Sequence, residues 1–322
     1  MSTTLKIGNR KSIHSGWMRG SFGISVHWTT QSVRADGSHL PYREAVAAFD
    51  PERFADSLAE VEAKHCIFTL THAEQYLALP HPVLEKLLPG RTTERDLIGE
   101  LIDALTARGI RFIAYYNRAC NGDDEPAWRE ACGYAAGISG NLDAFARNIC
   151  AVVELIATRY GEKLSGWWFD SSYAVDPRGP HNTVSCEMNG WQFPWANLAR
   201  AATRGNPECA VTFNAGIGSR FLYADCQSYY AGEAVTLTER FSPAPRSGMR
   251  DTRWICLDSP DWLFSAKHAA TGFSAPRFSD SEAANYLNRH LRHGRMVTFN
   301  LLIDQEGRIN PAALNQLRRL RK

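Results

Sequence analysis

Short apolar runs alternate along the chain with segments in which apolar residues recur every three or four positions. The first pattern predicts buried strands and the second predicts amphipathic helices. Eight apolar runs have the length of strands, and they cover residues 22–28, 65–72, 110–117, 164–170, 209–214, 224–231, 253–258 and 295–303. Strands that alternate with helices predict a parallel sheet, and eight such units predict a (β/α)8 barrel.

Helix start signals lie between these runs. Asp50 precedes Pro51, so we expect Asp50 to cap a helix in which Phe54 and Leu58 recur on one face. Thr93 is expected to cap the next helix, whose leucines repeat every four residues. Further helices are predicted at residues 142–160, 195–204, 281–293 and 311–320.

The segment 233–252 interrupts the alternation. Pro243, Pro245 and Gly248 exclude a regular helix there, so we expect a distorted region or an active-site loop. A doubly wound open sheet is the alternative to a barrel, but no G-x-G-x-x-G or Walker loop follows a predicted strand. We therefore expect residues 1–322 to form a single (β/α)8 barrel that is somewhat irregular in its second half.

Charge and composition exclude several classes of protein. The 36 Lys and Arg nearly balance the 34 Asp and Glu, which leaves a net charge of +2 and argues against a nucleic-acid-binding surface. No apolar run approaches the roughly 18 residues of a membrane span, and residues 1–14 are polar, so we expect a cytoplasmic protein. The eight widely spaced cysteines indicate reduced thiols rather than disulfides or zinc ligands.

The candidate chemistry lies where the predicted strands end, because a barrel forms its active site at the carboxyl ends of its strands. These ends are unusually polar. They carry His27, His72, Glu74, Tyr116, Asn117, Asp170, Asn214, Glu233, Asp258 and Asn300.

Two of these carboxylates suggest glycoside hydrolysis. Asp170 ends an aromatic strand that contains Trp168, and Glu233 follows a glycine at which the chain can turn. One carboxylate would attack the anomeric carbon or activate water, while the other protonates the leaving oxygen. The sequence is equally consistent with ordinary roles, as a helix cap for Asp170 and as a surface loop residue for Glu233. Glu239 and Glu74 are alternatives for the second catalytic carboxylate.

A metal-dependent hydrolase is a weaker alternative, in which His27, His72, Asp170 and Asp258 would bind the ion. The first strand has no H-x-H pair, and no H-E-x-x-H helix occurs in the chain. We therefore expect neither a metal nor a cofactor, and we expect a carbohydrate or glycoside as the binding partner.

Five motifs, in order, resemble glycoside hydrolase family 29, the α-L-fucosidases. Residues 17–28 resemble the family's first strand, which ends in F-G-I-F-I-H-W-G, and residues 49–65 resemble the helix that follows it. Residues 114–117 are similar to its G-x-Y-Y-S. Residues 168–170 resemble W-F-D-G, and residues 299–309 resemble L-N-V-G-P-D-A-D-G-R-I.

The resemblance implies a retaining hydrolase of the barrel type. Asp170 would be the nucleophile, Glu233 the acid/base, and the two carboxyl groups would stand roughly 5–5.5 Å apart. The side chains expected to contact the sugar are His27, Trp28, His72, Glu74, Tyr116, Asn214 and Trp168. Family members commonly carry a C-terminal β-sandwich, which we do not expect within these 322 residues.

The sequence also departs from the family pattern. Residues 72–76 read H-A-E-Q-Y where the family has H-H-D-G-F, and Ser171 replaces the glycine after the nucleophile. The family's sugar-binding arginine after Asn214 is missing, and Arg220 is the nearest one that could reach the same space. Two alternatives therefore stay open: a related hydrolase that acts on another sugar or a glycosylated metabolite, and a catalytically inert sugar-binding barrel.

Overall fold

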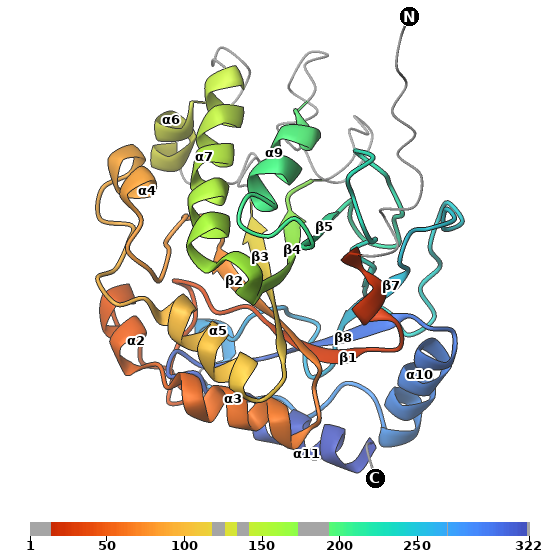
Figure 1. The fold of residues 1–322 in the computed structure, drawn as a ribbon. Helices are drawn as coiled ribbons and strands as arrows, with labels where there is room; N and C mark the ends of the chain where they lie inside the picture. Colours follow the sequence, from red (N-terminus) through yellow and green to blue (C-terminus); the bar gives the residue numbers. More distant parts are fainter. Residues whose placement is uncertain (1–13, 118–125, 134–141, 173–192, 269, 321–322) are drawn as a thin grey trace, which may run out of the picture.

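The computed structural model describes residues 14–117, 126–133, 142–172, 193–268 and 270–320. Within them, eight parallel strands form one curled sheet in the order β5-β4-β3-β2-β1-β8-β7-β6 (Figure 1), which confirms the predicted barrel. The strands are β1 (Phe22–Val26), β2 (His65–Thr71), β3 (Arg111–Asn117), β4 (Leu164–Asp170), β5 (Ala210–Phe213), β6 (Glu233–Ala234), β7 (Thr252–Cys256) and β8 (Met296–Leu301).

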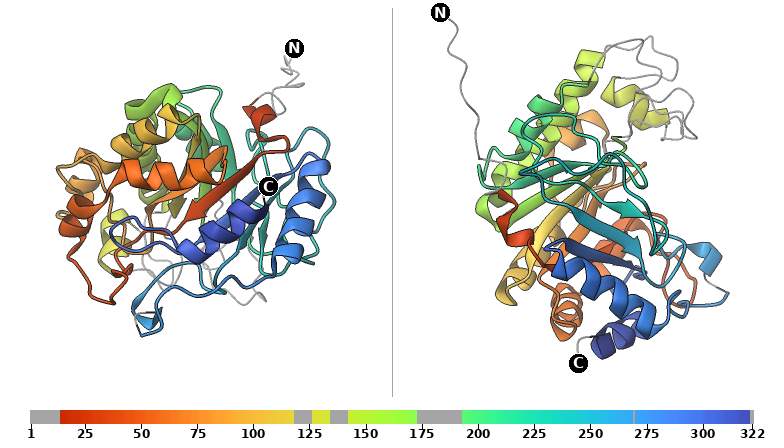
Figure 2. Two further views of the ribbon diagram at one scale, coloured as in Figure 1. Left: turned by 90° about the horizontal axis from the view of Figure 1, so that it is seen from below. Right: turned by 90° about the vertical axis from the view of Figure 1, so that its right-hand side faces the viewer.

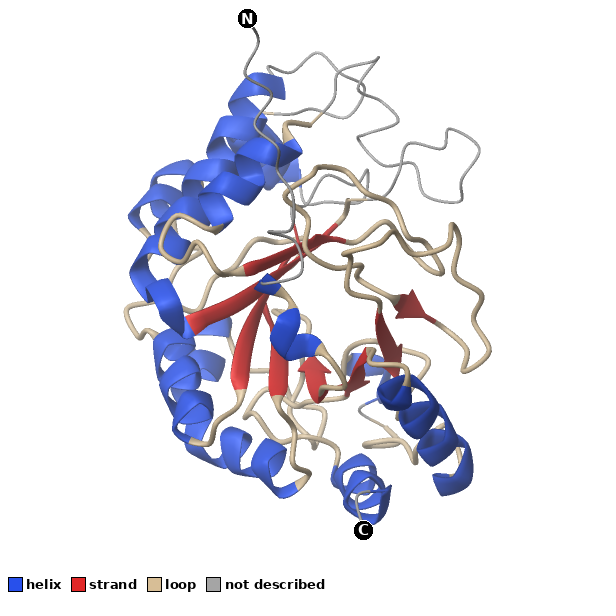
Figure 3. Cartoon of the chain, turned by 45° about the vertical axis from the view of Figure 1, so that its right-hand side comes forward, coloured by secondary structure: helices blue, strands red, loops and turns tan. Residues whose placement is uncertain are grey.

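Helices cover the outer face of the strands, and α10 and α11 lie side by side (Figure 2). The α-helices are α2 (Tyr42–Ala48), α3 (Pro51–Glu60), α4 (Pro82–Leu87), α5 (Leu97–Ala107), α6 (Pro126–Cys132), α7 (Leu142–Tyr160), α9 (Trp195–Ala202), α10 (Asp280–Arg292) and α11 (Pro311–Leu320). Short 3-10 turns occupy η1 (Gly16–Met18), η2 (Gly161–Lys163) and η3 (Ala266–His268). The described part of the segment 233–252 contains no helix, as predicted, and loops form this side of the barrel (Figure 3).

Helix caps follow from side chains that accept a hydrogen bond from a backbone N–H of the first turn. Asp50 caps α3 by accepting from the N–H of Arg53, as predicted. The predicted cap of α5 was wrong, because Asp96 accepts from the N–H of Gly99. The hydroxyl of Thr93 instead donates to a backbone carbonyl two residues along the chain.

Side chains alternate between the interior of the barrel and its outer wall, as the strand period requires. On β4, Trp167 packs outward and donates its indole N–H to the carbonyl of Ala202 at the end of α9. Its neighbour Trp168 lies in the interior cluster, together with Tyr115 of β3. Tyr116 belongs to the outer core, so two adjacent tyrosines lie on opposite sides of the wall.

The sixth strand differs from the prediction. Residues 224–231 form no regular strand, and β6 is the dipeptide after them. The backbone N–H of Ser228 donates to Val211 of β5, and that of Tyr230 donates to Arg250. The stretch 228–232, which we call the seam, therefore closes the barrel between β5 and β6 with single hydrogen bonds in place of a continuous ladder.

Side chains explain why the seam is irregular. The hydroxyl of Thr252 lies 2.5 and 3.0 Å from the carbonyl oxygens of Tyr230 and Ala231. In a regular strand, these carbonyls would instead accept hydrogen bonds from the backbone N–H groups of a neighbouring strand. Gly232 then adopts a positive φ of 73°, and a Cβ atom there would stand 2.2 Å from the carbonyl oxygen of Thr252. Only glycine permits this approach to β7, and the chain joins β7 immediately after it.

The longest described helix is α7, and neither it nor another helix in the described ranges is long and apolar enough to cross a membrane. Cys66, Cys209 and Cys256 are buried thiols that form no disulfide. Burial raises the pKa of each of these thiols, so they are protonated at neutral pH.

Candidate active site

A pocket opens at the carboxyl ends of the strands, where the barrel fold predicts the active site. Its wall combines two carboxylates with histidine, tyrosine and tryptophan side chains. It is lined by His27, His72, Tyr115, Asn117, Trp168, Asp170, Ile217, Glu233, Ala234, Val235, Trp254, Cys256, Pro260, Trp262 and Arg277.

Asp170 ends β4 and is almost fully buried in the pocket wall. Its Oδ2 accepts a 2.5 Å hydrogen bond from the hydroxyl of Tyr115, and its Oδ1 accepts a 2.9 Å bond from the side-chain amide of Asn214. Ser171 follows in the left-handed region with φ 56°, and its hydroxyl donates to Oδ1 of Asn117 at 2.7 Å. The strand end and these bonds fix the direction in which the carboxylate points.

Glu233 begins β6 directly after the seam, whereas Asp170 ends β4 on the other side of β5. The amide nitrogen of Asn214 that binds Asp170 also donates to Oε2 of Glu233, at 2.6 Å. Burial and, to a smaller extent, the charge of Asp170 together raise the pKa of Glu233 to about 7, against the opposing effect of the bond from Asn214. The side chain can therefore exchange a proton at neutral pH, as a general acid and base must.

His27 lines the pocket, and a chain of hydrogen bonds holds its ring in place. The indole N–H of Trp254 donates to Ser25 Oγ at 2.8 Å, and Ser25 donates to Oδ1 of Asn300 at 2.7 Å. Nδ1 of His27 also binds Oδ1 of Asn300, at 2.9 Å. The amide N–H2 of Asn300 donates to the backbone carbonyl of Trp262, so its oxygen faces His27 and accepts the Nδ1 proton.

His27 is consequently an acceptor at its other ring nitrogen. Burial lowers the pKa of His27 to about 4, and His72 acts in the same direction, whereas Asn300 and Asp170 oppose the shift. The ring is neutral at physiological pH. With Nδ1 protonated, Nε2 carries a lone pair that can accept a hydrogen bond from a hydroxyl group.

Aromatic rings line the rest of the pocket. His72 stacks on Trp262 with centroids 4.6 Å apart, and Tyr115 stacks on Trp168 at 5.1 Å. Trp168 also tilts against Trp254 at 6.2 Å. The indole N–H of Trp168 is buried and has no hydrogen-bond partner among the described residues. Such rings can cover the C–H surface of a sugar, and the indole can donate to a bound oxygen.

The structure does not bring three of the expected sugar contacts to this pocket. Trp28 packs outward against Phe49 and donates its indole N–H to a backbone carbonyl. Tyr116 lies in the outer core, and its hydroxyl is buried there. Glu74 lines a separate small cleft behind His72. The alternation of side chains along a strand explains the first two, because His27 and Tyr115 occupy the inward positions beside them.

Two carboxylates considered for chemistry also lie away from the pocket. Asp258 is buried and accepts from the backbone N–H of Leu302 and the side chain of Asn310. Burial raises its pKa to about 6, although these hydrogen bonds oppose the rise. Glu239 accepts from the backbone N–H of Val235 and does not line the pocket. Asp258 thus joins two loops, which weakens its assignment as a metal ligand.

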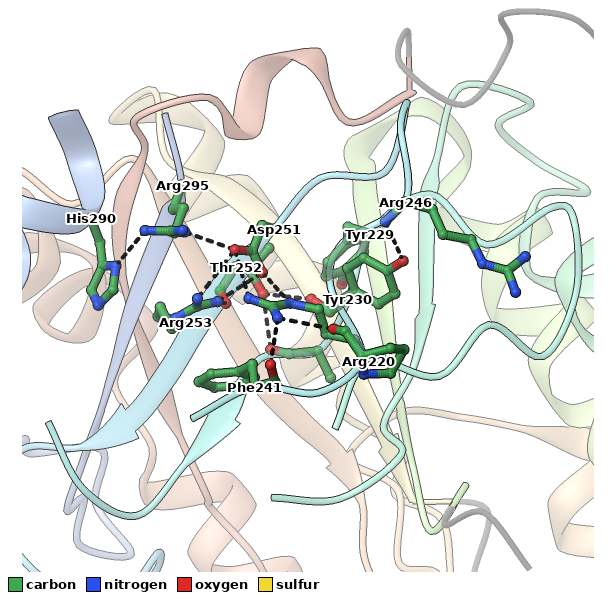
Figure 4. Close-up of polar contacts among 12 residues, drawn as sticks. Arg220, Tyr229, Tyr230, Phe241, Arg246, Asp251, Thr252, Arg253, His290 and Arg295 are labelled. Atoms are coloured by element: carbon green, nitrogen blue, oxygen red, sulfur yellow. Dashed lines mark hydrogen bonds and ion pairs between the residues drawn. The ribbon is translucent and has the colours of Figure 1, made fainter. Parts of the chain in front are cut away.

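Arg220 does not line this pocket, so the expectation that it could reach the substrate site is not met. It is buried against Asp251, which also binds Arg253 and Arg295 (Figure 4). Burial alone would raise the pKa of Asp251, but hydrogen bonds from Arg253 and Arg220 and the charge of Arg253 outweigh it and lower the pKa to about 2. We call these four residues the Asp251 cluster, and it ties the loop before the seam to β7 and β8.

Several residues of the pocket were not predicted from the sequence. Tyr115 could have been found, because Asn117 is a strand-end residue and every second residue before it must share its side of the wall. Trp262 and Arg277 lie on loops after β7, and Ile217 and Val235 lie on loops beside the seam. Strand periodicity carries no signal for such loop positions.

The described residues contain no group of three or more His, Cys, Asp or Glu side chains that could hold a metal ion. Of the four candidate ligands, His27, His72 and Asp170 line the pocket, whereas Asp258 bonds to Leu302 and Asn310 outside it. The predicted pair of carboxylates, by contrast, meets on one pocket wall, and their catalytic roles remain predictions.

The fold and the site together define a class. A (β/α)8 barrel with two carboxylates in one pocket has the architecture of a glycoside-hydrolase catalytic domain. The sequence profile of the family described as Alpha-L-fucosidase matches residues 38–244. The chain belongs to the α-L-fucosidase family, as its motifs predicted.

Individual relatives agree with this assignment. The tissue α-L-fucosidase of Bos taurus is 29% identical over a match that covers 30% of this chain and 27% of the bovine protein. The chain thus matches about a quarter of that relative's length.

Solved structures share the fold. An α-L-fucosidase of glycoside hydrolase family 29 from Bacteroides thetaiotaomicron superposes with a TM-score of 0.62 at 14% identity, over 95% of this chain and 72% of its own. An endo-fucoidan hydrolase of family 107 gives a TM-score of 0.70 at 15% identity, over 96% of this chain and 53% of its own.

Proposed function

We propose that this protein is a retaining glycosidase that cleaves a terminal α-L-fucosyl bond, with Asp170 as nucleophile and Glu233 as acid/base. The family membership supports the substrate class, and the shared amide of Asn214 supports the mechanism. Oδ1 of Asp170 and Oε2 of Glu233 both accept from that one nitrogen, at 2.9 and 2.6 Å, so these two oxygens lie at most about 5.5 Å apart. Inverting enzymes separate their carboxyl groups by roughly 6.5–9.5 Å to admit a water molecule.

The reaction would proceed in two displacements. Asp170 attacks the anomeric carbon as the bond to the leaving oxygen breaks, and Glu233 gives its proton to that oxygen. Glu233, now ionised, then removes a proton from water, and the resulting hydroxide oxygen displaces Asp170 from the anomeric carbon. Both steps use the same two side chains.

The coupling between the carboxylates suits this change of role. In the free enzyme the charge of Asp170 helps to raise the pKa of Glu233 to about 7, after the larger effect of burial. Once Asp170 is an ester its charge is gone, so the pKa of Glu233 falls. Glu233 is then poised as a base for the second displacement.

The remaining wall would bind the sugar. Nε2 of His27 would accept from a sugar hydroxyl, since Asn300 holds the proton on Nδ1. The stacked rings of Tyr115 and Trp168 would contact the C–H face of a deoxy sugar, and the indole of Trp168 would gain an acceptor.

Following the anomer of the first product by NMR tests the mechanism. A retaining enzyme releases α-L-fucose first, whereas release of the β anomer would contradict the proposed roles. Asp170→Asn should abolish turnover of an aryl α-L-fucoside without altering the folded structure, measured by circular dichroism. Turnover of other aryl glycosides, but not of the fucoside, would reassign the sugar.

A further inference from the structure

We propose that the mouth of the pocket is a subsite for an apolar leaving group, an alkyl or aryl aglycone, formed by Ile217, Val235 and Trp262. This inference rests on the proposed function, because it assigns the part of the substrate that departs. The subsite would determine which leaving groups the enzyme prefers, in addition to its preference for the sugar.

Exposed apolar side chains are concentrated at this one place. In the described part of the chain, the large hydrophobic residues that are more than a third exposed are Ile217 at 49%, Phe221 at 46%, Val235 at 46% and Trp262 at 37%. Three of the four line the pocket, and only Phe221 does not. Apolar surface gathered around a concave site marks a place for an apolar ligand.

The position of two of these residues identifies the leaving-group side. Val235 follows Glu233 by two residues, and the backbone N–H of Gly218, next to Ile217, donates to the carbonyl of Glu233 at 2.9 Å. Glu233 must lie within hydrogen-bond reach of the leaving oxygen to protonate it. The group attached to that oxygen therefore passes the side chains that flank Glu233.

Trp262 adds an anchored aromatic surface to the same opening. Its ring stacks on His72 and lies edge-on to His27, at centroid distances of 4.6 and 5.1 Å. Its backbone carbonyl accepts from Asn300, so the loop is fixed to the floor of the site. A rigid aromatic residue contributes apolar contact area at low entropic cost.

Most polar side chains of the pocket stand at strand ends rather than at its mouth. The carboxylates, His27 and Asn117 occupy strand ends, whereas Arg277 is the charged side chain at the loop-built mouth. Its guanidinium donates to the backbone carbonyls of Cys256 and Val235, each at 3.2 Å. A sugar leaving group with several hydroxyls would find few side-chain partners here, while an apolar group would bury surface.

Comparing methyl and hexyl α-L-fucosides tests the subsite. Methanol and hexanol have similar acidity, so a difference in kcat/KM reports contacts of the chain rather than leaving-group chemistry. Each fully buried methylene contributes about fourfold. With about half of the added surface buried, we expect hexyl fucoside to react about thirtyfold faster than methyl fucoside.

Variants at the mouth of the pocket test whether its apolar side chains cause the preference for the hexyl group. The double variant Ile217→Thr and Val235→Thr should reduce the hexyl-to-methyl ratio to below about fivefold, because both changes keep the branched shape and add a hydroxyl. Phe221→Thr is the matched control, since Phe221 is equally exposed but lies outside the pocket, and it should keep the ratio. A wild-type ratio near one, or an equal loss of preference in both variants, would overturn the proposal.

Binding separates this inference from the proposed function. The methyl and hexyl 1-thio-α-L-fucosides resist hydrolysis, so calorimetry measures their affinity ratio without turnover. Preferred binding of the hexyl compound by a protein that hydrolyses no fucoside would refute the catalytic proposal and retain the subsite. Equal affinities, or binding of neither compound, would refute the subsite.

Discussion

The hydroxyl of Tyr115 on β3 lies 2.5 Å from Oδ2 of Asp170 on β4, and the two strands pair directly. The bond comes from the tyrosine that faces the barrel interior, not from its outward neighbour Tyr116. It holds one oxygen of the carboxylate while Asn214 holds the other. The direction of the proposed nucleophile is therefore built into the sheet.

Removing that hydroxyl tests its contribution. Tyr115→Phe should lower kcat/KM for an aryl fucoside about 10- to 100-fold, because a hydrogen bond to a charged group is worth about 1.5–3 kcal/mol. Tyr116→Phe is the matched control on the outer wall and should leave kcat/KM within about twofold. Equal effects of the two variants would contradict a specific role for Tyr115.

The activity should fall on the alkaline side with the ionisation of Glu233. Its pKa is raised to about 7, so the protonated acid predominates below that pH and is lost above it. For a substrate with a poor leaving group, we expect kcat/KM to decrease about tenfold per pH unit above pH 7. The pH profile of Glu233→Gln should lack this limb, whereas Glu239→Gln should retain it.

The orientation of His27 depends on Asn300. In Asn300→Ala the Nδ1 proton loses its acceptor, and we expect KM to rise about tenfold with a smaller change in kcat. Asn300→Asp keeps an acceptor but adds a negative charge, which should move the pKa of His27 upward from about 4. An NMR titration of the imidazole measures this shift, and an unmoved His27 signal would contradict the contact.

The Asp251 cluster should dominate one part of the stability. Asp251→Asn leaves the buried guanidinium groups of Arg220 and Arg253, and the partly buried one of Arg295, without their carboxylate, so we expect a loss of about 3–5 kcal/mol in the free energy of unfolding. The exposed pair of Asp103 and Lys163 provides a control, and Asp103→Asn should leave the urea midpoint nearly unchanged. Equal midpoints for the two variants would show that the cluster is not stabilising.

The same cluster predicts an acid limit to stability. The pKa of Asp251 is about 2 in the folded protein and near 3.8 when unperturbed. The unfolded chain therefore binds the proton more readily, and the stabilisation is complete above about pH 4 and disappears as the pH falls towards 2. Unfolding curves between pH 5 and 2 should show this loss in the wild type and a smaller one in Asp251→Asn.

The barrel and its strand ends could be predicted because periodicity and the order of elements determine them. Asp170 and Asn214 were found as the last residues of strands, and the structure brings them together. The predictions for Trp28 and Tyr116 failed because they required a choice of which strand residues face the barrel interior. Each of these two residues is one position away from an inward-facing residue. Assigning the inward set from Asn117 and His27 would have replaced Tyr116 by Tyr115 and excluded Trp28.

The rest of the site depends on contacts that no local pattern carries. Residues 224–231 were predicted to be a strand as one of the short apolar runs, but Thr252, distant in sequence, binds the carbonyls of Tyr230 and Ala231. Trp262 and Ile217 reach the pocket on loops, whose paths depend on tertiary packing. Arg220 was placed near the sugar by its position in the sequence, whereas Asp251 draws it away.

The two catalytic candidates stand on opposite sides of the gap between β5 and β6, where a few hydrogen bonds close the barrel wall. Asn214 spans this gap and contacts both carboxylates. Any opening of the wall between β5 and β6 would lengthen the distance between the two carboxylates on which the proposed reaction depends. The local rigidity of this part of the barrel would thus set the fraction of time in which the two carboxylates stand at the proposed catalytic distance. Slow amide hydrogen exchange at Ser228 and Tyr230 would then accompany high turnover.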